Sequence, residues 1–313
     1  MNTDTNSNKI WTQPQGYAGY EQREYRFTNE MRPMFFKWLG IKETSHILDA
    51  GCGTGVFGRY LAKGLTTGKV TGFDINEGFI EYGRKRLEEL GLSQKMTIEL
   101  GDGFNLHYVD NSFDVVTDYT YLGVLSDPMA GLKEKIRVCK PGGRVSCVVS
   151  TFSAPNIWWQ GDYSFEGAQE LQQLASLESD IHHKHVWKAI SASLNQGSEW
   201  HGQRYLKLFD LCGLTDIKLH PYAYIMNYCD DALPLEYRKN LLYDETNSEI
   251  GYLAWRYNEN MEIYKEHGFG DFKFERLTEL LKVKLDYINK DFANDKSYEW
   301  RGGFNFIVTG EKP

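Results

Sequence analysis

The sequence predicts an α/β fold in which helices are wound onto both faces of a mostly parallel β-sheet. Between residues 41 and 150, five short segments typical of strands alternate with amphipathic helical segments, which is the order of a doubly wound sheet. A glycine-rich turn follows the first strand, and the first two strands are each closed by an aspartate, Asp49 and Asp74. Carboxylates and glycines are typical of the carboxyl edge of such a sheet, where a ligand binds.

The core elements are expected in the following order. A helix over 28–39 ends at Gly40, and helical spacing of apolar residues returns just after the glycine turn. Asn76 is well placed to cap a helix that runs to about residue 90, and Asp127-Pro128 begins another. The five strands are expected near 47–50, 69–74, 96–100, 113–118 and 144–150.

The remainder of the chain predicts insertions into this core. Residues 1–40 are interpreted as an aromatic arm and helix that act as a lid, residues 41–150 as the cofactor-binding core, and residues 203–225 as a return to the sheet with a strand at 217–225. Helical insertions are expected at 151–202, with helices over 164–177 and 179–194, and at 226–300; residues 301–313 supply the last core strand.

Gly51, Gly53 and Gly55 form the centre of the predicted site. Without Cβ atoms, their backbone lets a ligand and a helix N-terminus approach closely. A dinucleotide fingerprint reads G-x-G-x-x-G, whereas the third glycine here comes one position early. This spacing disfavours a nicotinamide-dependent dehydrogenase.

The amino-acid composition argues against some classes of binding partner and indicates a cellular compartment. A net charge of −8 and a pI near 5.6 argue against nucleic acid or an anionic membrane as the main partner. The sequence has no apolar run of membrane-spanning length and no apolar signal core at its start. Five cysteines without a C-x-x-C motif fit the reducing cytoplasm, and Cys52 is interpreted as a small turn residue rather than a catalyst.

Over about residues 43–150, and again at 203–225 and 304–312, the chain resembles the class I S-adenosylmethionine-dependent methyltransferases. The resemblance implies a Rossmann-like, seven-stranded sheet with an antiparallel last strand, S-adenosylmethionine as cofactor, and methyl transfer to a small molecule. The motifs that carry it are Leu48-Asp49-Ala50-Gly51-Cys52-Gly53-Thr54-Gly55, Asp74, Gly101-Asp102, Phe113-Asp114-Val115-Val116 and Lys140-Pro141-Gly142-Gly143.

The same motifs suggest individual roles. Asp74, about 20 residues after the glycine turn, is suited to accept hydrogen bonds from a ribose diol, although it could merely cap the next helix. Asp102 would accept from the adenine amino group. The resemblance places Asp49 near the methionine moiety, and Asp118 and Tyr119 near the cofactor's amino group and the acceptor. The expected cofactor-binding set is Tyr20, Asp49, Gly51, Cys52, Gly53, Gly55, Asp74, Ile75, Gly101, Asp102, Gly103, Phe104, Asp118 and Tyr119.

The sequence says less about the residues that bind the methyl acceptor. Many small-molecule members carry a histidine pair shortly after the fourth strand, where this chain reads Leu-Gly-Val-Leu-Ser-Asp, so no general base can be carried over. Tyr119 and His201 are the catalytic candidates, although His201 could be an ordinary surface histidine. Aromatic residues are expected to line a closed pocket for a small, apolar or amine-bearing acceptor: Tyr20, Tyr119, Trp158, Trp159 and Trp200.

Other interpretations stay open. The chain could bind S-adenosylmethionine without transferring methyl, or could methylate a macromolecule, and a homodimer is compatible with the sequence. His182, His183 and His185 lack the i, i+4 spacing that places two imidazoles on one helix face, so we expect no metal site.

Overall fold

The computed structural model of the chain describes residues 21–150, 165–186, 203–227, 235–293 and 300–313. The chain forms two compact units, the first made of residues 1–154, 199–224 and 303–313, and the second of residues 155–198 and 225–302. Every described residue of the predicted cofactor site belongs to the first unit.

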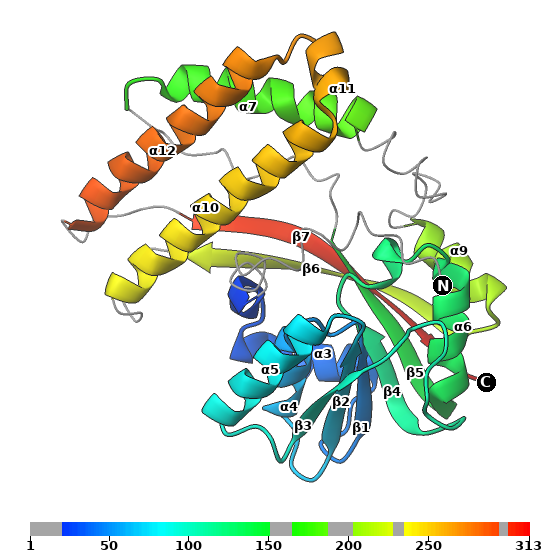
Figure 1. The fold of residues 1–313 in the computed structure, drawn as a ribbon. Helices are drawn as coiled ribbons and strands as arrows, with labels where there is room; N and C mark the ends of the chain where they lie inside the picture. Colours follow the sequence, from blue (N-terminus) through cyan, green and yellow to red (C-terminus); the bar gives the residue numbers. More distant parts are fainter. Residues whose placement is uncertain (1–20, 151–164, 187–202, 228–234, 294–299) are drawn as a thin grey trace. The chain divides into compact units, whose positions relative to one another are not determined.

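The first unit is built on a seven-stranded sheet with the strand order β3-β2-β1-β4-β5-β7-β6 (Figure 1). Strands β1 to β5 pair in parallel, whereas β7 runs antiparallel to β5. The predicted sheet and its antiparallel last strand are therefore confirmed. The order reverses direction between β1 and β4, which opens a crevice at their carboxyl ends. The strands are β1 (His46–Ala50), β2 (Lys69–Asp74), β3 (Met96–Leu100), β4 (Phe113–Asp118), β5 (Cys139–Ser150), β6 (Thr215–Asn227) and β7 (Trp300–Glu311).

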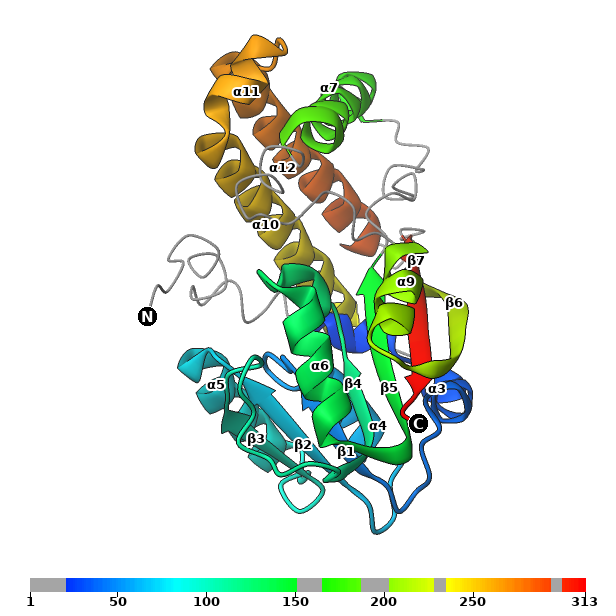
Figure 2. The same cartoon turned by 90° about the vertical axis from the view of Figure 1, so that its right-hand side faces the viewer.

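Helices cover both faces of this sheet (Figures 1 and 2). One face carries α3 (Arg32–Leu39), α4 (Val56–Ala62) and α5 (Glu77–Glu89). The other face packs α6 (Pro128–Val138) and α9 (Gln203–Leu211) onto strand residues in one apolar cluster. Burial of this apolar area, at about 25 cal/mol per Å², is the main force that holds the layers together.

Helix caps fix where the helices next to the site begin. The Asn76 side chain accepts a hydrogen bond from the Phe79 amide at 3.2 Å, and Asp127 accepts one from the Ala130 amide at 2.9 Å. Both predicted caps are confirmed. Each satisfies an amide of the first turn that has no partner inside the helix.

Two predicted helix boundaries were wrong. The helix expected over 28–39 is divided into a 3-10 turn, η2 (Asn29–Met31), and α3, because Pro33 has no amide hydrogen and fits only the first turn of an α-helix. The break expected at residue 178 is absent: α7 (Ala168–Ile181) runs through it and continues into a π-helical turn, η5 (His182–Val186).

The second unit is mainly helical where it is described, with α7, α10 (Leu235–Glu259), α11 (Met261–Glu266) and α12 (Asp271–Ala293), and it also contains the end of β6 and the start of β7. Glu178 explains the continuity of α7, since its buried carboxylate binds Arg256 at 3.0 Å and accepts a hydrogen bond from the Tyr264 hydroxyl at 2.7 Å. Among the described helices, none combines the length and the apolar character needed to cross a membrane.

Candidate functional site

The glycine turn lies at the carboxyl edge of β1, directly before α4. Gly51, Gly53 and Gly55 all adopt positive φ angles, 61°, 55° and 85°, a region that only glycine enters without steric cost. Asp74 fixes the turn from the end of β2, because its Oδ2 accepts a hydrogen bond from the Gly53 amide at 2.8 Å and its Oδ1 one from the Asn76 amide at 2.9 Å. Burial raises the pKa of the Asp74 carboxyl, and the backbone amides partly oppose this rise.

An open cleft of about 720 Å³ lies at the ends of β2 and β3. Its walls include Ile75 and Leu100, which are 65% and 52% exposed, and it also contains Asp102. Asp102 Oδ1 accepts a hydrogen bond from the Phe104 amide at 2.9 Å. Apolar walls beside a carboxylate suit a flat heterocycle that carries an amino group. The full lining is Ile75, Asn76, Glu77, Gly78, Leu100, Gly101, Asp102 and His107.

Two buried aspartates lie beneath the turn. Asp49 is 1% exposed, and neither of its carboxylate oxygens makes a well-aligned hydrogen bond to a described residue, although the Gly58 amide lies close enough to lower its pKa slightly. Burial and the nearby charge of Asp118 raise the pKa of Asp49 to about 8. A buried carboxylate without a partner is costly, so it indicates a group that a ligand completes.

Asp118 differs from Asp49 because it is already paired. Its carboxylate binds the buried ammonium group of Lys135 and accepts a hydrogen bond from the Tyr121 amide at 3.2 Å. Lys135 also donates to the Ser146 carbonyl at 2.6 Å. The contact of Asp118 with the cofactor's amino group stays a prediction.

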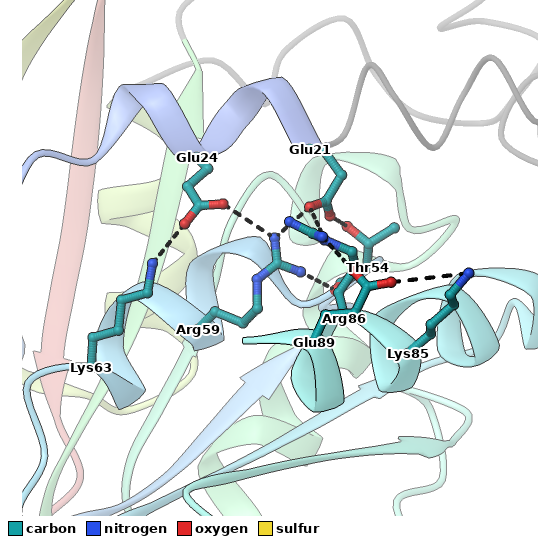
Figure 3. A network of polar contacts seen from close by, with 8 residues as sticks. All are labelled: Glu21, Glu24, Thr54, Arg59, Lys63, Lys85, Arg86 and Glu89. Carbon is teal, nitrogen blue, oxygen red and sulfur yellow. Dashed lines mark hydrogen bonds and ion pairs between the residues drawn. The ribbon is translucent and has the colours of Figure 1, made fainter. Parts of the chain in front are cut away.

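The N-terminal segment docks on the glycine turn (Figure 3). Glu21 accepts hydrogen bonds from the Thr54 hydroxyl at 2.7 Å and from Arg59 at 2.8 Å. The Arg59 side chain is fully buried and donates to the Thr54 carbonyl at 2.9 Å. Farther out, Glu24 pairs with Lys63 at 2.7 Å. The short helix η1 (Gln22–Arg26) is thus tied to the turn by charged contacts.

Two arginines of η1 reach the end of β4. Arg23 lies 5.6 Å from the centroid of the Tyr119 ring, and Arg26 donates to the Tyr119 hydroxyl at 3.1 Å. Phe27 packs edge-on against the same ring at 5.2 Å. A small cavity of about 10 Å³ lies under this cover, lined by Arg23, Asp49, Gly51, Cys52, Val56, Phe57 and Tyr119.

The predicted site residues therefore divide into groups. Ile75, Gly101 and Asp102 line the open cleft, whereas Asp49, Gly51, Cys52 and Tyr119 line the small cavity. Phe104 is 41% exposed and is not part of either lining. Five predicted residues lie outside the described residues: Tyr20, Trp158, Trp159, Trp200 and His201.

The sequence did not suggest Arg23, Arg26, Arg59 or Tyr121, which the structure brings to the site. Arg59 could have been noticed, because it is a charged residue within an apolar helical run. Within the described ranges, no cluster of three or more histidine, cysteine or acidic side chains could hold a metal ion.

Known proteins with sequences similar to this chain include methyltransferases. A methyltransferase-domain family matches residues 47–143. The demethylmenaquinone methyltransferase of Bacillus mycoides is 30% identical over 187 residues, which are 59% of this chain and 76% of that protein. The enzyme of the same name from Bacillus velezensis is 29% identical over 216 residues, 66% of this chain and 88% of that protein.

A solved structure shares the fold. It is phosphoethanolamine N-methyltransferase 2 of Haemonchus contortus, in complex with phosphomonomethylethanolamine and S-adenosylhomocysteine. Its TM-score to this chain is 0.51 at 18% identity, and the match covers 97% of this chain and 59% of that one.

Proposed function

Because the chain belongs to the class I S-adenosylmethionine-dependent methyltransferases, we propose that it transfers the methyl group of this cofactor to a small, largely apolar acceptor. The observation that carries the proposal is the pair of arginines beside Tyr119, at the end of β4. They lie where the family resemblance expects the acceptor to meet the methyl group.

The first unit has the groups that the cofactor requires. Asp74 would accept hydrogen bonds from the ribose hydroxyls through the lone pairs that the two backbone amides leave unused. Asp102 would accept from the adenine amino group, with Ile75 against the ring. Arg23 and Asp49 line the same small cavity, so a guanidinium and a carboxyl group are available for the carboxylate and ammonium of the amino-acid moiety.

The residues of this chain contribute alignment and a dry site. When bound, S-adenosylmethionine supplies a methyl group that its sulfonium already activates for in-line displacement. Phe27, which is 6% exposed, packs against Phe57, Tyr60 and Tyr119 and keeps water from the end of β4. Tyr119 is held by the Arg26 hydrogen bond, so its ring forms a fixed wall for the acceptor. Such alignment is a large source of rate enhancement.

The charges near Tyr119 distinguish the two acceptor classes that the sequence left open. Arg23 lies over the ring of Tyr119, and the Arg26 guanidinium lies 5.0 Å from the ring centroid of Tyr224. The aromatic faces that would attract a cationic amine are thus already covered by cations. Guanidinium groups instead stabilise negative charge that develops on a nucleophile. These contacts support a neutral or anionic apolar acceptor, in agreement with the demethylmenaquinone named for the bacterial relatives.

A turnover assay tests the proposal. Purified protein is incubated with S-adenosylmethionine and a panel that contains a demethylmenaquinone with a short side chain, reduced chemically to its hydroquinone so that its ring is nucleophilic, together with simple phenols, primary amines, and a macromolecular fraction. Formation of S-adenosylhomocysteine is measured for each. We expect turnover with the hydroquinone or the phenols only. Turnover with amines or macromolecules would refute the acceptor class, and cofactor binding without any turnover would indicate a binding protein.

A further inference from the structure

The side chain of Tyr121 occupies the space between two glycines of the cofactor site. A Cβ atom built on Gly51 would meet Cδ2 of Tyr121 at 2.1 Å, and one built on Gly103 would meet the Tyr121 hydroxyl oxygen at 1.4 Å. Gly51 follows β1 and Gly103 follows β3. Because β2 lies between these strands in the sheet, the tyrosine ring extends across the end of β2, where Asp74 lies.

The ring lies between Gly51, which lines the small cavity, and Gly103, which follows the residues that line the open cleft, although Tyr121 is not part of either lining. The open cleft is lined by Gly101 and Asp102, the two residues that precede Gly103, whereas the small cavity is lined by Gly51 and Cys52. A nucleoside joined to an amino acid must extend from one cavity to the other. The direct path runs between Gly51 and Gly103, through the volume that the ring fills.

The ring is held by packing but not by a hydrogen bond. Its edge meets Phe73 at a centroid distance of 6.0 Å, in a T-shaped contact. The Tyr121 hydroxyl is buried without a hydrogen-bond partner among the described residues. A buried hydroxyl without a partner loses its hydration and gains nothing in return, so this position of the ring is destabilised relative to one that reaches water.

The backbone on both sides of Tyr121 is anchored. The Tyr121 amide donates to Asp118 Oδ1 at 3.2 Å, and the Thr120 amide donates to the Val148 carbonyl at 2.8 Å. Thr120 also has a φ of 61°, which is uncommon for a β-branched residue and costs energy. We therefore expect the side chain of Tyr121, and not strand β4, to move.

We propose that Tyr121 is a gate residue of the cofactor cleft, whose ring closes the passage between Gly51 and Gly103 and swings out when the cofactor enters. The inference rests on the proposed function, because it takes S-adenosylmethionine as the molecule that crosses the passage. It adds that binding occurs in two steps, opening and occupation.

Stopped-flow fluorescence with S-adenosylhomocysteine tests the gate in the full-length protein. For the wild type, the observed rate should saturate with ligand concentration, because opening limits it. For Tyr121→Ala, the rate should rise linearly, and if the open state holds about a tenth of the population, affinity should improve about tenfold. Tyr121→Phe keeps the ring and should still saturate.

Tyr108→Ala is the matched control, since Tyr108 is also half-buried and packs on the same apolar cluster as Tyr121. Its binding rate should saturate as in the wild type, without any gain in affinity. Should Tyr121→Ala fail to fold, Tyr121→Leu replaces it, because the shorter side chain loses the hydroxyl end that lies against Gly103 and should likewise abolish saturation.

The possible results distinguish a failure of the gate proposal from a failure of the proposed cofactor site. If all variants bind S-adenosylhomocysteine but Tyr121→Ala binds more weakly than the wild type, Tyr121 contacts the ligand and the gate is refuted. A linear dependence for the wild type refutes it as well. If neither the wild type nor any variant binds S-adenosylhomocysteine, the cofactor site itself is wrong.

Discussion

Replacing Arg59 by methionine should destabilise the first unit and loosen the N-terminal cover. Arg59 is fully buried and binds Glu21 at 2.8 Å, Glu24 at 3.6 Å and the Thr54 carbonyl at 2.9 Å. Methionine fills much of the same volume but leaves the Thr54 carbonyl without its donor. The charged contact to η1, shown in Figure 3, is lost at the same time.

The expected loss in the free energy of unfolding depends on the contacts that Glu21 keeps after Arg59 is replaced. Removing one member of a buried ion pair costs about 3–5 kcal/mol when the other is left buried and unpaired. Glu21 is 17% exposed and keeps a contact with Arg86 at 3.3 Å, so part of that cost is avoided. We expect a loss of about 3 kcal/mol in the free energy of unfolding, from the lost charged contact and the unsatisfied carbonyl.

Guanidinium denaturation followed by circular dichroism measures this loss, and the midpoint should fall by about 0.5–1 M. Arg86→Met is the matched control from the same network. The Arg86 side chain is 31% exposed, so its replacement should cost less than about 1 kcal/mol. Equal losses for the two variants would refute the reasoning. The double variant Arg59→Met/Glu21→Leu should recover part of the loss, because the unpaired carboxylate is removed.

Three further predictions concern the cofactor. Asp74→Ala should lower affinity for S-adenosylhomocysteine at least about tenfold, because hydrogen bonds to a charged acceptor contribute roughly 1.5–3 kcal/mol; unchanged affinity in calorimetry would exclude the ribose role. Asp49→Asn should weaken cofactor binding and stabilise the free protein. Burial raises the folded-state pKa to about 8 from 3.8, so the folded state holds its proton more tightly, and the stability gain should grow from about pH 4 to pH 8; a constant difference in pH-dependent unfolding would contradict this. Deleting residues 1–26, which keeps the buried Phe27, should leave the protein folded but less stable, because Arg59 loses Glu21 and Glu24, and should reduce turnover roughly tenfold to 100-fold, because Arg23 and Arg26 are lost; full activity would exclude a cover.

The sheet and its caps were predictable because their causes are local. Apolar segments alternate with helical ones along the chain, and Asn76 and Asp127 bind amides only three residues ahead. The predicted break between two helices at residue 178 was wrong, because the contacts that keep α7 continuous involve residues far away in the sequence. Glu178 binds Arg256 and Tyr264, which are 78 and 86 residues away in the sequence.

The same distinction applies to the site. The glycine turn and the aspartates at the carboxyl ends of β1 and β2, Asp49 next to the last residue of β1 and Asp74 the last of β2, are recognisable in the sequence by residue type and spacing. Arg59 is not, because its partner Glu21 precedes it by 38 residues, in an arm whose aromatic residues predict docking but do not indicate which carboxylate pairs with Arg59. In the structure, all seven residues of α4 are buried, Arg59 included. A charge inside such a run requires a counter-charge from elsewhere in the chain, and only the fold identifies it.

Gly51 shows why a motif alone cannot describe the site. A missing Cβ lets a ligand approach the backbone, and it equally lets a side chain of the same protein do so. Here the closest atoms to the missing Cβ belong to Tyr121, a residue 70 positions later. The two uses are compatible only if they alternate. Among the described residues, the Tyr121 hydroxyl has no hydrogen-bond partner to hold the ring in place, and the buried carboxylate of Asp49 has none that a ligand would have to displace.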